Sequence, residues 1–184
     1  MCQELGMKVI AISDVSGGIV DLKGIDIQAI FMHKTLEDVQ ADERIGSAEV
    51  LEVKCDVLIP AALGGVINEG NMNRINAGFI IEGANQPITA TADKELRAQG
   101  VLIVPDILAN SGGVMGSYFE WTQNIQEFSW PIDKFRRELD ARMEKAFINV
   151  HEVSKKYSID LRTAAFVVSV GRVAEAFEMR GSLV

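Results

Sequence analysis

The sequence is poor in cysteine, and its thiols have no spacing that indicates a metal site or a disulfide framework. Cys2 and Cys55 are the only cysteines among 184 residues. They form neither a CxxC pair nor a larger set, so we expect two reduced thiols in a cytoplasmic protein. The histidines, His33 and His151, have no carboxylate or cysteine at ligand spacing. The sequence therefore predicts no metal site.

Positive charge and long apolar runs are also scarce. The 18 Lys and Arg are outnumbered by 26 Asp and Glu, for a formal net charge of −8. A sequence-independent grip on nucleic acid phosphates needs clustered basic residues, so no nucleic acid partner is expected. The apolar runs, such as residues 57–63 and 101–104, are too short to span a bilayer, and the start of the sequence resembles no signal peptide. We expect a soluble protein without a membrane partner.

Short apolar runs alternate with longer amphipathic stretches, which predicts a parallel sheet between helices. The expected strands are residues 8–13, 56–59, 79–81 and 101–104. Helices are expected over 26–37, up to residue 53, over 69–75 and up to residue 99, and then over 111–128, 131–156 and 161–180. Between the first two strands we expect a turn at Gly17 and Gly18 and a loop over 41–46. The predicted helix N-caps are Ser47, Asn68, Thr89 and Asp160.

This pattern indicates an α/β fold: a Rossmann-like parallel sheet with helices on both faces, followed by C-terminal helices. At this length we expect a single domain over residues 1–184. In open α/β sheets, ligands bind outside the carboxyl ends of the strands. Residues at those ends are therefore the candidates for a binding site.

Asp14 ends the first strand. An acidic residue there can accept hydrogen bonds from ribose hydroxyls and repel a 2′-phosphate, which favours NAD over NADP. The alternative is a turn-forming aspartate that bonds to its own backbone.

Small and amide residues follow the later strands. Ala61 and Ala62 let a flat ligand approach the backbone, although helix packing also selects alanine. Asn85, in the EGAN string at 82–85, offers a donor and an acceptor to a carboxamide or a ribose hydroxyl, or it stabilises a turn. Asn110 precedes Gly112 and Gly113, which permit close approach, and Val114 and Ser117 lie on one face of the helix that follows.

Three strings resemble the nucleotide-binding domain of glutamate dehydrogenases, within the glutamate, leucine, phenylalanine and valine dehydrogenase family. They are PDILANSGGVMGSYFEWTQN at 105–124, EGAN with Gln86 and Pro87, and LRTAAFVVSVGRVAEA at 161–176. The resemblance implies an NAD cofactor, with NADP also possible, and glutamate or 2-oxoglutarate as substrate. It also implies a homo-oligomer for the full-length protein. Leucine-type members lack the SYFEW run, so glutamate is the favoured substrate class.

The resemblance implies roles for particular residues. Val114 and Ser117 would line the substrate pocket, with the serine hydroxyl on the distal carboxylate, and no catalytic residue is expected in this chain. The cofactor-binding residues would be Asp14, Ala61, Ala62, Gly83, Asn85 and Asn110.

The sequence departs from the family at several positions. Gly64 and Gly65 follow Leu63, Ser111 replaces alanine, and Met115 with Gly116 replaces threonine and valine. We expect Gly116 to enlarge or loosen the pocket wall.

The first strand, the glycine-rich phosphate loop and the substrate domain of the family are absent from the sequence. We therefore expect either a fragment of a longer dehydrogenase or a sheet that has closed the gap or borrowed a strand, and a chain that is inactive alone. The alternative function is a non-catalytic or split subunit that acts as a binding or assembly module.

Overall fold

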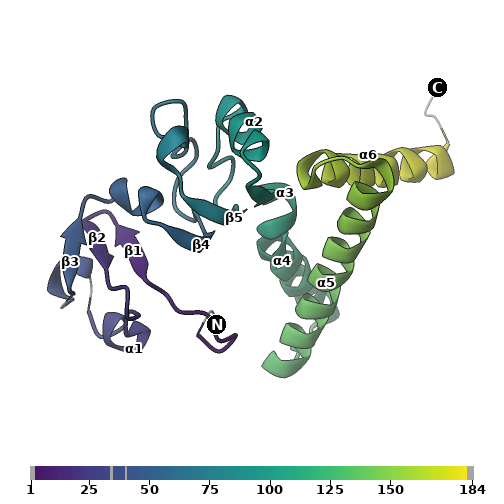
Figure 1. Ribbon diagram of the computed structural model, residues 1–184. Helices are drawn as coiled ribbons and strands as arrows, with labels where there is room; N and C mark the ends of the chain where they lie inside the picture. The colour runs from purple at the N-terminus through teal and green to yellow at the C-terminus, as the bar shows by residue number, and fades with distance from the viewer. Residues whose placement is uncertain (1–2, 34, 40, 182–184) are drawn as a thin grey trace. The chain divides into compact units, whose positions relative to one another are not determined.

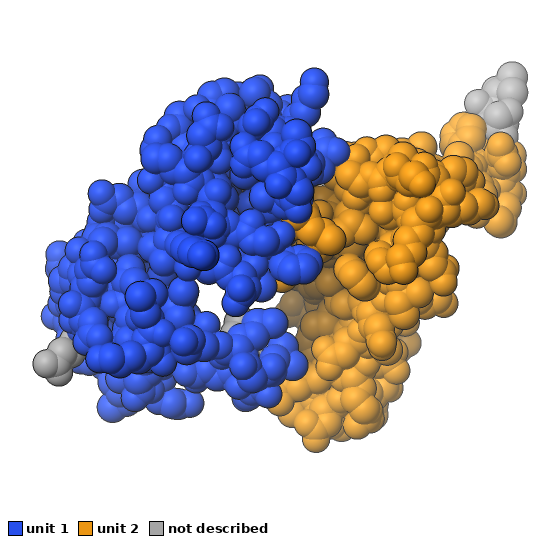
Figure 2. Space-filling model, in the orientation of Figure 1, with its two compact units in different colours: residues 1–60, 65–80, 88–101 blue, residues 61–64, 81–87, 102–184 orange. Residues whose placement is uncertain are grey.

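The computed structural model describes residues 3–33, 35–39 and 41–181. The chain divides into two compact units (Figure 2). Unit 1 contains residues 1–60, 65–80 and 88–101, and unit 2 contains residues 61–64, 81–87 and 102–184. Each unit is therefore assembled from segments that are distant in the sequence.

Unit 1 begins with an antiparallel sheet in the order β1-β2-β3 (Figure 1). Its strands are β1 (Ala11–Asp14), β2 (Gly17–Val20) and β3 (Glu43–Ile45). The reversal expected after Asp14 is confirmed as a two-residue turn at 15–16, and Gly17 has a positive φ of +145°, but Gly17 and Gly18 themselves belong to β2. The expected loop over 41–46 is wrong, because β3 forms there and pairs with β2. Burial explains β2: Ile19 and Val20 are β-branched and buried, and such residues pack well on a pleated surface.

The helix expected over 26–37 is also wrong. Only the short helix α1 (Ile27–Ile30) and the 3-10 turn η1 (Leu36–Asp38) form there. Asp26 caps α1 by accepting from two backbone amides, but α1 buries no residue that would extend it. Arg44 donates to the carbonyl oxygens of Leu36 and Glu37 at 3.0 and 2.8 Å. These contacts satisfy carbonyls that a continuous helix would have used for itself.

A second sheet has the order β4-β5-β6. Its strands are β4 (Cys55–Leu58), β5 (Ala77–Ile81) and β6 (Leu102–Val104), and β4 pairs with β5 in parallel. The strands expected at 56–59, 79–81 and 101–104 are therefore confirmed within one or two residues. The fold is mixed α/β, with one parallel and one antiparallel sheet, instead of the single parallel sheet that was expected.

The connections within unit 1 contain less helix than expected. Two of them are single 3-10 turns, η2 (Glu49–Glu52) and η3 (Met72–Arg74). Ser47 does not cap the first, because its hydroxyl donates to the backbone oxygen of Asp14 at 2.6 Å. Asn68 does not cap the second, because its side-chain oxygen accepts from the Gly70 amide.

The expected helix after Thr89 is confirmed as α2 (Ala90–Ala98). The Thr89 hydroxyl accepts from the Ala92 amide at 3.3 Å, as an N-cap does.

Unit 2 contains the C-terminal helices, which pack in sequence along the chain (Figure 1). They are α3 (Asp106–Ala109), α4 (Ser111–Gln126), α5 (Ile132–Tyr157) and α6 (Leu161–Arg180). The predicted cap of α6 is confirmed, because Asp160 accepts from the Thr163 amide at 3.0 Å. One buried apolar cluster of this unit consists of Leu108, Val150, Leu161, Ala164 and Ala165. None of the helices among the described residues has the length and apolar character needed to cross a membrane.

Two helices of unit 2 expose stripes of large apolar side chains. The α4 stripe is Val114, Tyr118, Trp121 and Ile125, all more than half exposed. A second stripe on α6 is Phe166, Val170, Val173 and Phe177. Both follow the alternating spacing of four and three residues that a helix presents to a partner surface. The four apolar residues of the α6 stripe therefore lie outside the buried core of unit 2.

Substitutions at two glycines compare the tightly packed antiparallel sheet with an open position on α6. A Cβ at Gly18 would overlap Val50 and lie 3.2 Å from Ile45, so Gly18→Ala should lower the free energy of unfolding by about 1–3 kcal/mol. At Gly171 in α6 nothing lies within 4 Å, so Gly171→Ala should raise it by up to about 1 kcal/mol. Urea denaturation measures both changes. Equal effects of the two substitutions would contradict this packing.

Candidate functional site

The candidate site of unit 2 lies where β5 and β6 end. Glu82 directly follows β5, and its backbone amide donates to the carbonyl oxygen of Val104, the last residue of β6. Two residues after that carbonyl, Asp106 begins α3. The two strand ends therefore bring the EGAN turn beside the start of α3.

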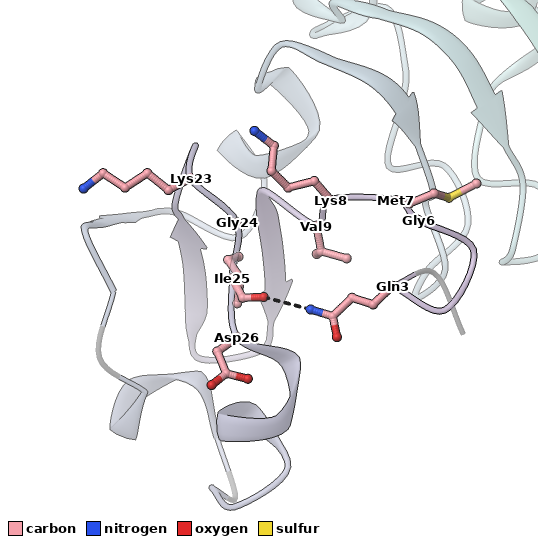
Figure 3. A pocket seen from close by; sticks show the side chains of 9 residues that line it. All are labelled: Gln3, Gly6, Met7, Lys8, Val9, Lys23, Gly24, Ile25 and Asp26. Carbon is pink, nitrogen blue, oxygen red and sulfur yellow. Dashed lines mark hydrogen bonds between the residues drawn. The ribbon is translucent and has the colours of Figure 1, made fainter.

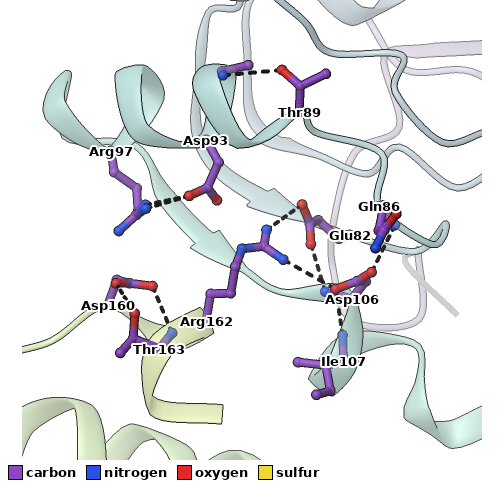
Figure 4. Close-up of polar contacts among 11 residues, drawn as sticks. Glu82, Gln86, Thr89, Asp93, Arg97, Asp106, Ile107, Asp160, Arg162 and Thr163 are labelled. Carbon is purple, nitrogen blue, oxygen red and sulfur yellow. Dashed lines mark hydrogen bonds and ion pairs between the residues drawn. The ribbon is translucent and has the colours of Figure 1, made fainter. Parts of the chain in front are cut away.

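A buried carboxylate joins these elements to α6 (Figure 4). Glu82 is fully buried and forms an ion pair with Arg162, at 2.7 Å between Oε1 and Nη2. Its other oxygen, Oε2, accepts from the Asp106 backbone amide at 2.7 Å. Arg162 also contacts the Asp106 carboxylate at 3.3 Å. Both Glu82 oxygens are thus satisfied, as a buried carboxylate requires.

Asp106 also holds the EGAN turn. Its Oδ2 accepts from the Gln86 backbone amide at 2.8 Å. Gln86 has a φ of +47°, in the left-handed region that residues other than glycine rarely adopt. Such strain persists only where surrounding contacts enforce it, and it is concentrated at functional sites.

The strained turn places Asn85 against Asn110, which lies between α3 and α4. The Asn110 Nδ2 donates to the Asn85 Oδ1 at 2.7 Å. Each side chain still has a hydrogen-bonding group for which the described residues supply no partner: the Asn85 amide NH2 and the Asn110 carbonyl oxygen. The pair therefore presents one donor and one acceptor, side by side.

Other predicted residues surround this pair. The segment 61–64, with the exposed Ala61 and Ala62, passes close to the EGAN turn, and a Cβ at Gly64 would lie 3.0 Å from the Asn85 backbone oxygen. Gly65 has a φ of +67°. The unusual glycine pair after Leu63 therefore has local causes: a close backbone approach and a left-handed conformation.

A mainly apolar groove of about 540 Å³ adjoins Asn110. Its lining consists of Ile107, Asn110, Ser111, Val114, Met115 and Tyr118. The predicted substrate residue Val114 therefore lies in the same groove as Asn110. Ser117 is exposed on α4 but does not line the groove, and its hydroxyl donates to the Gly113 carbonyl at 3.2 Å.

The glycines of α4 have different roles from those expected. A Cβ at Gly116 would meet the Phe135 ring of α5 at 3.4 Å, so Gly116 faces the helix packing instead of the pocket wall. A Cβ at Gly112 would contact Met143 of the same helix at 3.6 Å. Only Gly113 leaves open space. The expectation that Gly116 enlarges the pocket is therefore wrong.

Asp14 is the one predicted site residue that lies in unit 1. Its Oδ1 accepts from the Ser16 amide at 2.7 Å and from the Ser16 hydroxyl at 2.5 Å, and its Oδ2 accepts from the Leu36 amide at 3.0 Å. The hydroxyl of Ser16 and the amides of Leu36 and Ser16 lower the pKa of this carboxyl. The structure thus shows the turn-forming contacts that were the alternative to a ribose contact.

The pocket of unit 1 contains none of the predicted site residues. This hollow of about 500 Å³ lies between the segment before β1 and the loop after β2 (Figure 3). Gln3 donates across it to the Ile25 carbonyl at 3.3 Å, and Lys8 donates to the Leu22 carbonyl at 2.9 Å. These two side chains therefore bind backbone of the same unit.

Sequence reasoning missed three residues that organise the site: Glu82, Asp106 and Arg162. All three lie inside the strings that resemble the family, but no role was expected for them. Arg162 lies in the first turn of α6, where the helix dipole disfavours a cation. A cation at that position, together with a glutamate directly after a strand, is the sequence signal from which the ion pair could have been predicted.

A polar turn and a groove at the carboxyl ends of neighbouring strands are typical of ligand-binding α/β proteins. Comparison with known proteins defines the group further. Residues 1–181 match the Glutamate/Leucine/Phenylalanine/Valine dehydrogenase family, and the chain belongs to that family.

Individual relatives agree with this assignment. The chain is 47% identical over 183 residues to a glutamate dehydrogenase from Thermotoga maritima, a match that covers 97% of this chain and 44% of that protein. It is also similar to the hetero-hexameric glutamate dehydrogenase of Thermus thermophilus in its leucine-bound form, with a TM-score of 0.89, 27% identity and 99% and 44% of the two chains covered. For the glutamate dehydrogenase of Peptoniphilus asaccharolyticus the TM-score is 0.79 and the identity 31%, over 97% and 42% of the chains. The chain thus spans less than half the length of these relatives.

The buried ion pair generates a stability prediction. Arg162→Met leaves the Glu82 carboxylate buried without its counter-charge and should lower the free energy of unfolding by about 3 kcal/mol. The same substitution at the exposed Arg137 of α5 should change it by less than about 0.5 kcal/mol. Adding Glu82→Gln to Arg162→Met should recover part of the loss. Urea denaturation of the wild type, the two single variants and the double variant measures these changes. An equal loss of stability at both arginines would show that the ion pair contributes little.

The Asp14 contacts generate a second prediction. A carbon-detected NMR titration should give this carboxyl a pKa below 3.8, and Ser16→Ala should raise it because the Ser16 hydroxyl is the largest cause. Ser13→Ala, in the same strand, should leave it unchanged. Because the folded-state pKa is lowered, the stabilising contribution is complete above the unfolded pKa and is lost as pH falls through the folded value. An Asp14 carboxyl that titrates at or above 3.8 would contradict these contacts.

Proposed function

We propose that this chain is the NAD(P)-binding portion of an amino acid dehydrogenase that converts glutamate to 2-oxoglutarate and ammonia. Family membership and the similarity to three glutamate dehydrogenases support the reaction class. The proposal treats residues 1–184 as one nucleotide-binding domain. The full-length protein would form a homo-oligomer.

The observation that carries the proposal is the Asn85 and Asn110 pair. A nicotinamide carboxamide has one carbonyl acceptor and one NH2 donor. The Asn85 NH2 and the Asn110 carbonyl oxygen are complementary to these two groups, because the hydrogen bond between the side chains leaves them available. The residues therefore fit the nicotinamide end of the cofactor, which supplies the hydride chemistry when bound.

The remaining cofactor residues have supporting roles. Gly83, Ala61 and Ala62 have side chains of at most one carbon, so a flat ring system can approach the backbone at these positions. In unit 1, Asp14 would accept from a ribose hydroxyl. Its charge disfavours a 2′-phosphate, so the proposal favours NAD over NADP. Because three hydrogen bonds already hold this carboxylate, the ribose would use the remaining capacity of Oδ2.

The groove beside Asn110 is the proposed position of the amino acid side chain. Val114 lines it, and its methyl groups suit the methylene groups of glutamate. The Ser117 hydroxyl rotates about a single bond, so it can turn from the Gly113 carbonyl to donate to a distal carboxylate. These residues bind and orient the substrate, and no residue of this chain is assigned a proton transfer.

A second candidate function is a binding or assembly module that joins a complete dehydrogenase. The α4 stripe favours it, because exposed apolar residues in register along one helix face mark an interaction surface. The stripe begins at Val114 in the groove. A partner seated on it would therefore also cover the proposed substrate position.

Calorimetric titration separates the two functions. The wild-type chain should bind NAD more tightly than NADP, and it should show no turnover with glutamate and NAD. Asn85→Ala should weaken NAD binding by about tenfold, from the loss of hydrogen bonds to the carboxamide. Asn76→Ala, at an exposed asparagine of unit 1, is the control.

Each outcome of this titration has a meaning. Turnover by the chain alone would show that catalytic groups are present that we have not assigned. Failure to bind NAD alone, combined with binding to the full-length Thermotoga maritima homologue, would favour the assembly module. Trp121→Glu, in the centre of the α4 stripe, should then abolish the association.

A further inference from the structure

We infer that Asp106 is a positioning residue for the nicotinamide site: its carboxylate fixes the Asn85 and Asn110 pair without touching the ligand. The inference rests on the proposed function, because it explains why the Asn85 and Asn110 pair is already formed before the nicotinamide binds. It does not follow from that function, since neither strand ends nor small residues require an acidic residue at this position.

The first step is the strain at Gln86. Its φ of +47° is unfavourable for a residue with a Cβ, because the side chain crowds the backbone in the left-handed region. The Asp106 carboxylate accepts from the Gln86 amide at 2.8 Å, and a hydrogen bond to a charged acceptor is strong enough to offset such a cost. Without that acceptor the turn after Asn85 would relax toward negative φ.

The second step is the fixing of Asp106 itself. Its backbone amide donates to the buried Glu82 carboxylate, and its Oδ1 accepts from the Ile107 amide at 2.8 Å and from Arg162. Its side chain is only 16% exposed. The carboxylate therefore has one orientation, set by an ion pair that is anchored in α6.

The third step links the fixed Asp106 carboxylate to the ligand. Asn85 precedes the strained residue, and in this turn conformation its Oδ1 accepts from the Asn110 amide at 2.7 Å. When the turn relaxes, the Asn85 NH2 and the Asn110 oxygen no longer face the same side. A carboxamide would then lose one of its two contacts, while the rest of the dinucleotide would bind as before.

The test uses the whole chain and a pair of matched ligands. NAD is compared with its 3-acetylpyridine analogue, in which a methyl group replaces the carboxamide NH2, so that the Asn110 oxygen loses its donor. Wild type should prefer NAD by about tenfold. Asp106→Ala should reduce the preference to about onefold, whereas Asp106→Asn, which keeps an acceptor oxygen for the Gln86 amide, should retain most of it.

Asp93→Ala is the control for a merely structural effect. Asp93 is another buried carboxylate that accepts from an arginine, Arg97, at 2.8 Å, and it lies in unit 1. Its removal should lower stability as Asp106→Ala does but leave the tenfold preference intact. A loss of preference in Asp93→Ala equal to that in Asp106→Ala would overturn the positioning role.

A measurement without ligand keeps the inference separate from the proposed function. In the NMR spectrum of the free chain, the Asn110 side-chain amide should shift toward the values of unfolded chains in Asp106→Ala but not in Asp106→Asn. An unchanged Asn110 resonance in Asp106→Ala overturns the inference. If wild type fails to prefer NAD over the analogue, the proposed carboxamide contact is wrong, and the Asn110 resonance still decides the role of Asp106.

Discussion

The structure of unit 2 depends on one buried carboxylate. Glu82 is removed from water at the end of β5, and a charge in that position is tolerated only when a counter-charge and hydrogen-bond donors surround it. Arg162 supplies the charge from α6, and the Asp106 amide supplies a donor from α3. Three elements that are distant in the sequence must therefore meet before the carboxylate is satisfied. The pair restricts unit 2 to arrangements in which both strand ends meet α6.

The candidate site uses this restraint. The same arginine that neutralises Glu82 also holds Asp106, and Asp106 holds the strained turn that presents Asn85. A strained backbone and an arginine in the first turn of a helix are each unfavourable alone. Together they fix the side chains of Asn85 and Asn110, and neither side-chain amide takes part in the contacts that hold the turn. The pair keeps its donor and acceptor for a ligand, and a rigid framework lowers the entropy lost on binding.

The two units differ in what organises them. In unit 1, Arg44 and Asp14 satisfy backbone groups of the segment between β2 and β3, so that segment folds as short turns instead of a helix. In unit 2, long helices pack through small residues, with Gly112 and Gly116 allowing α4 to approach α5. The apolar stripes of α4 and α6 are left exposed by this packing. Such faces mark interaction surfaces, and the family relatives are more than twice as long as this chain.

The sequence by itself determined the elements whose cause is local. The strands that became β4, β5 and β6, the caps at Thr89 and Asp160, and the full extent of α6 follow from apolar runs and capping chemistry that neighbouring residues supply. The family also follows from the sequence, because its strings are continuous. Tertiary structure decided the rest. The antiparallel sheet, the short turns after β2 and the direction faced by Gly116 depend on residues far away in the sequence. So does the site's organisation, because Glu82 and Arg162 are separated by 80 residues and only folding brings their charges together.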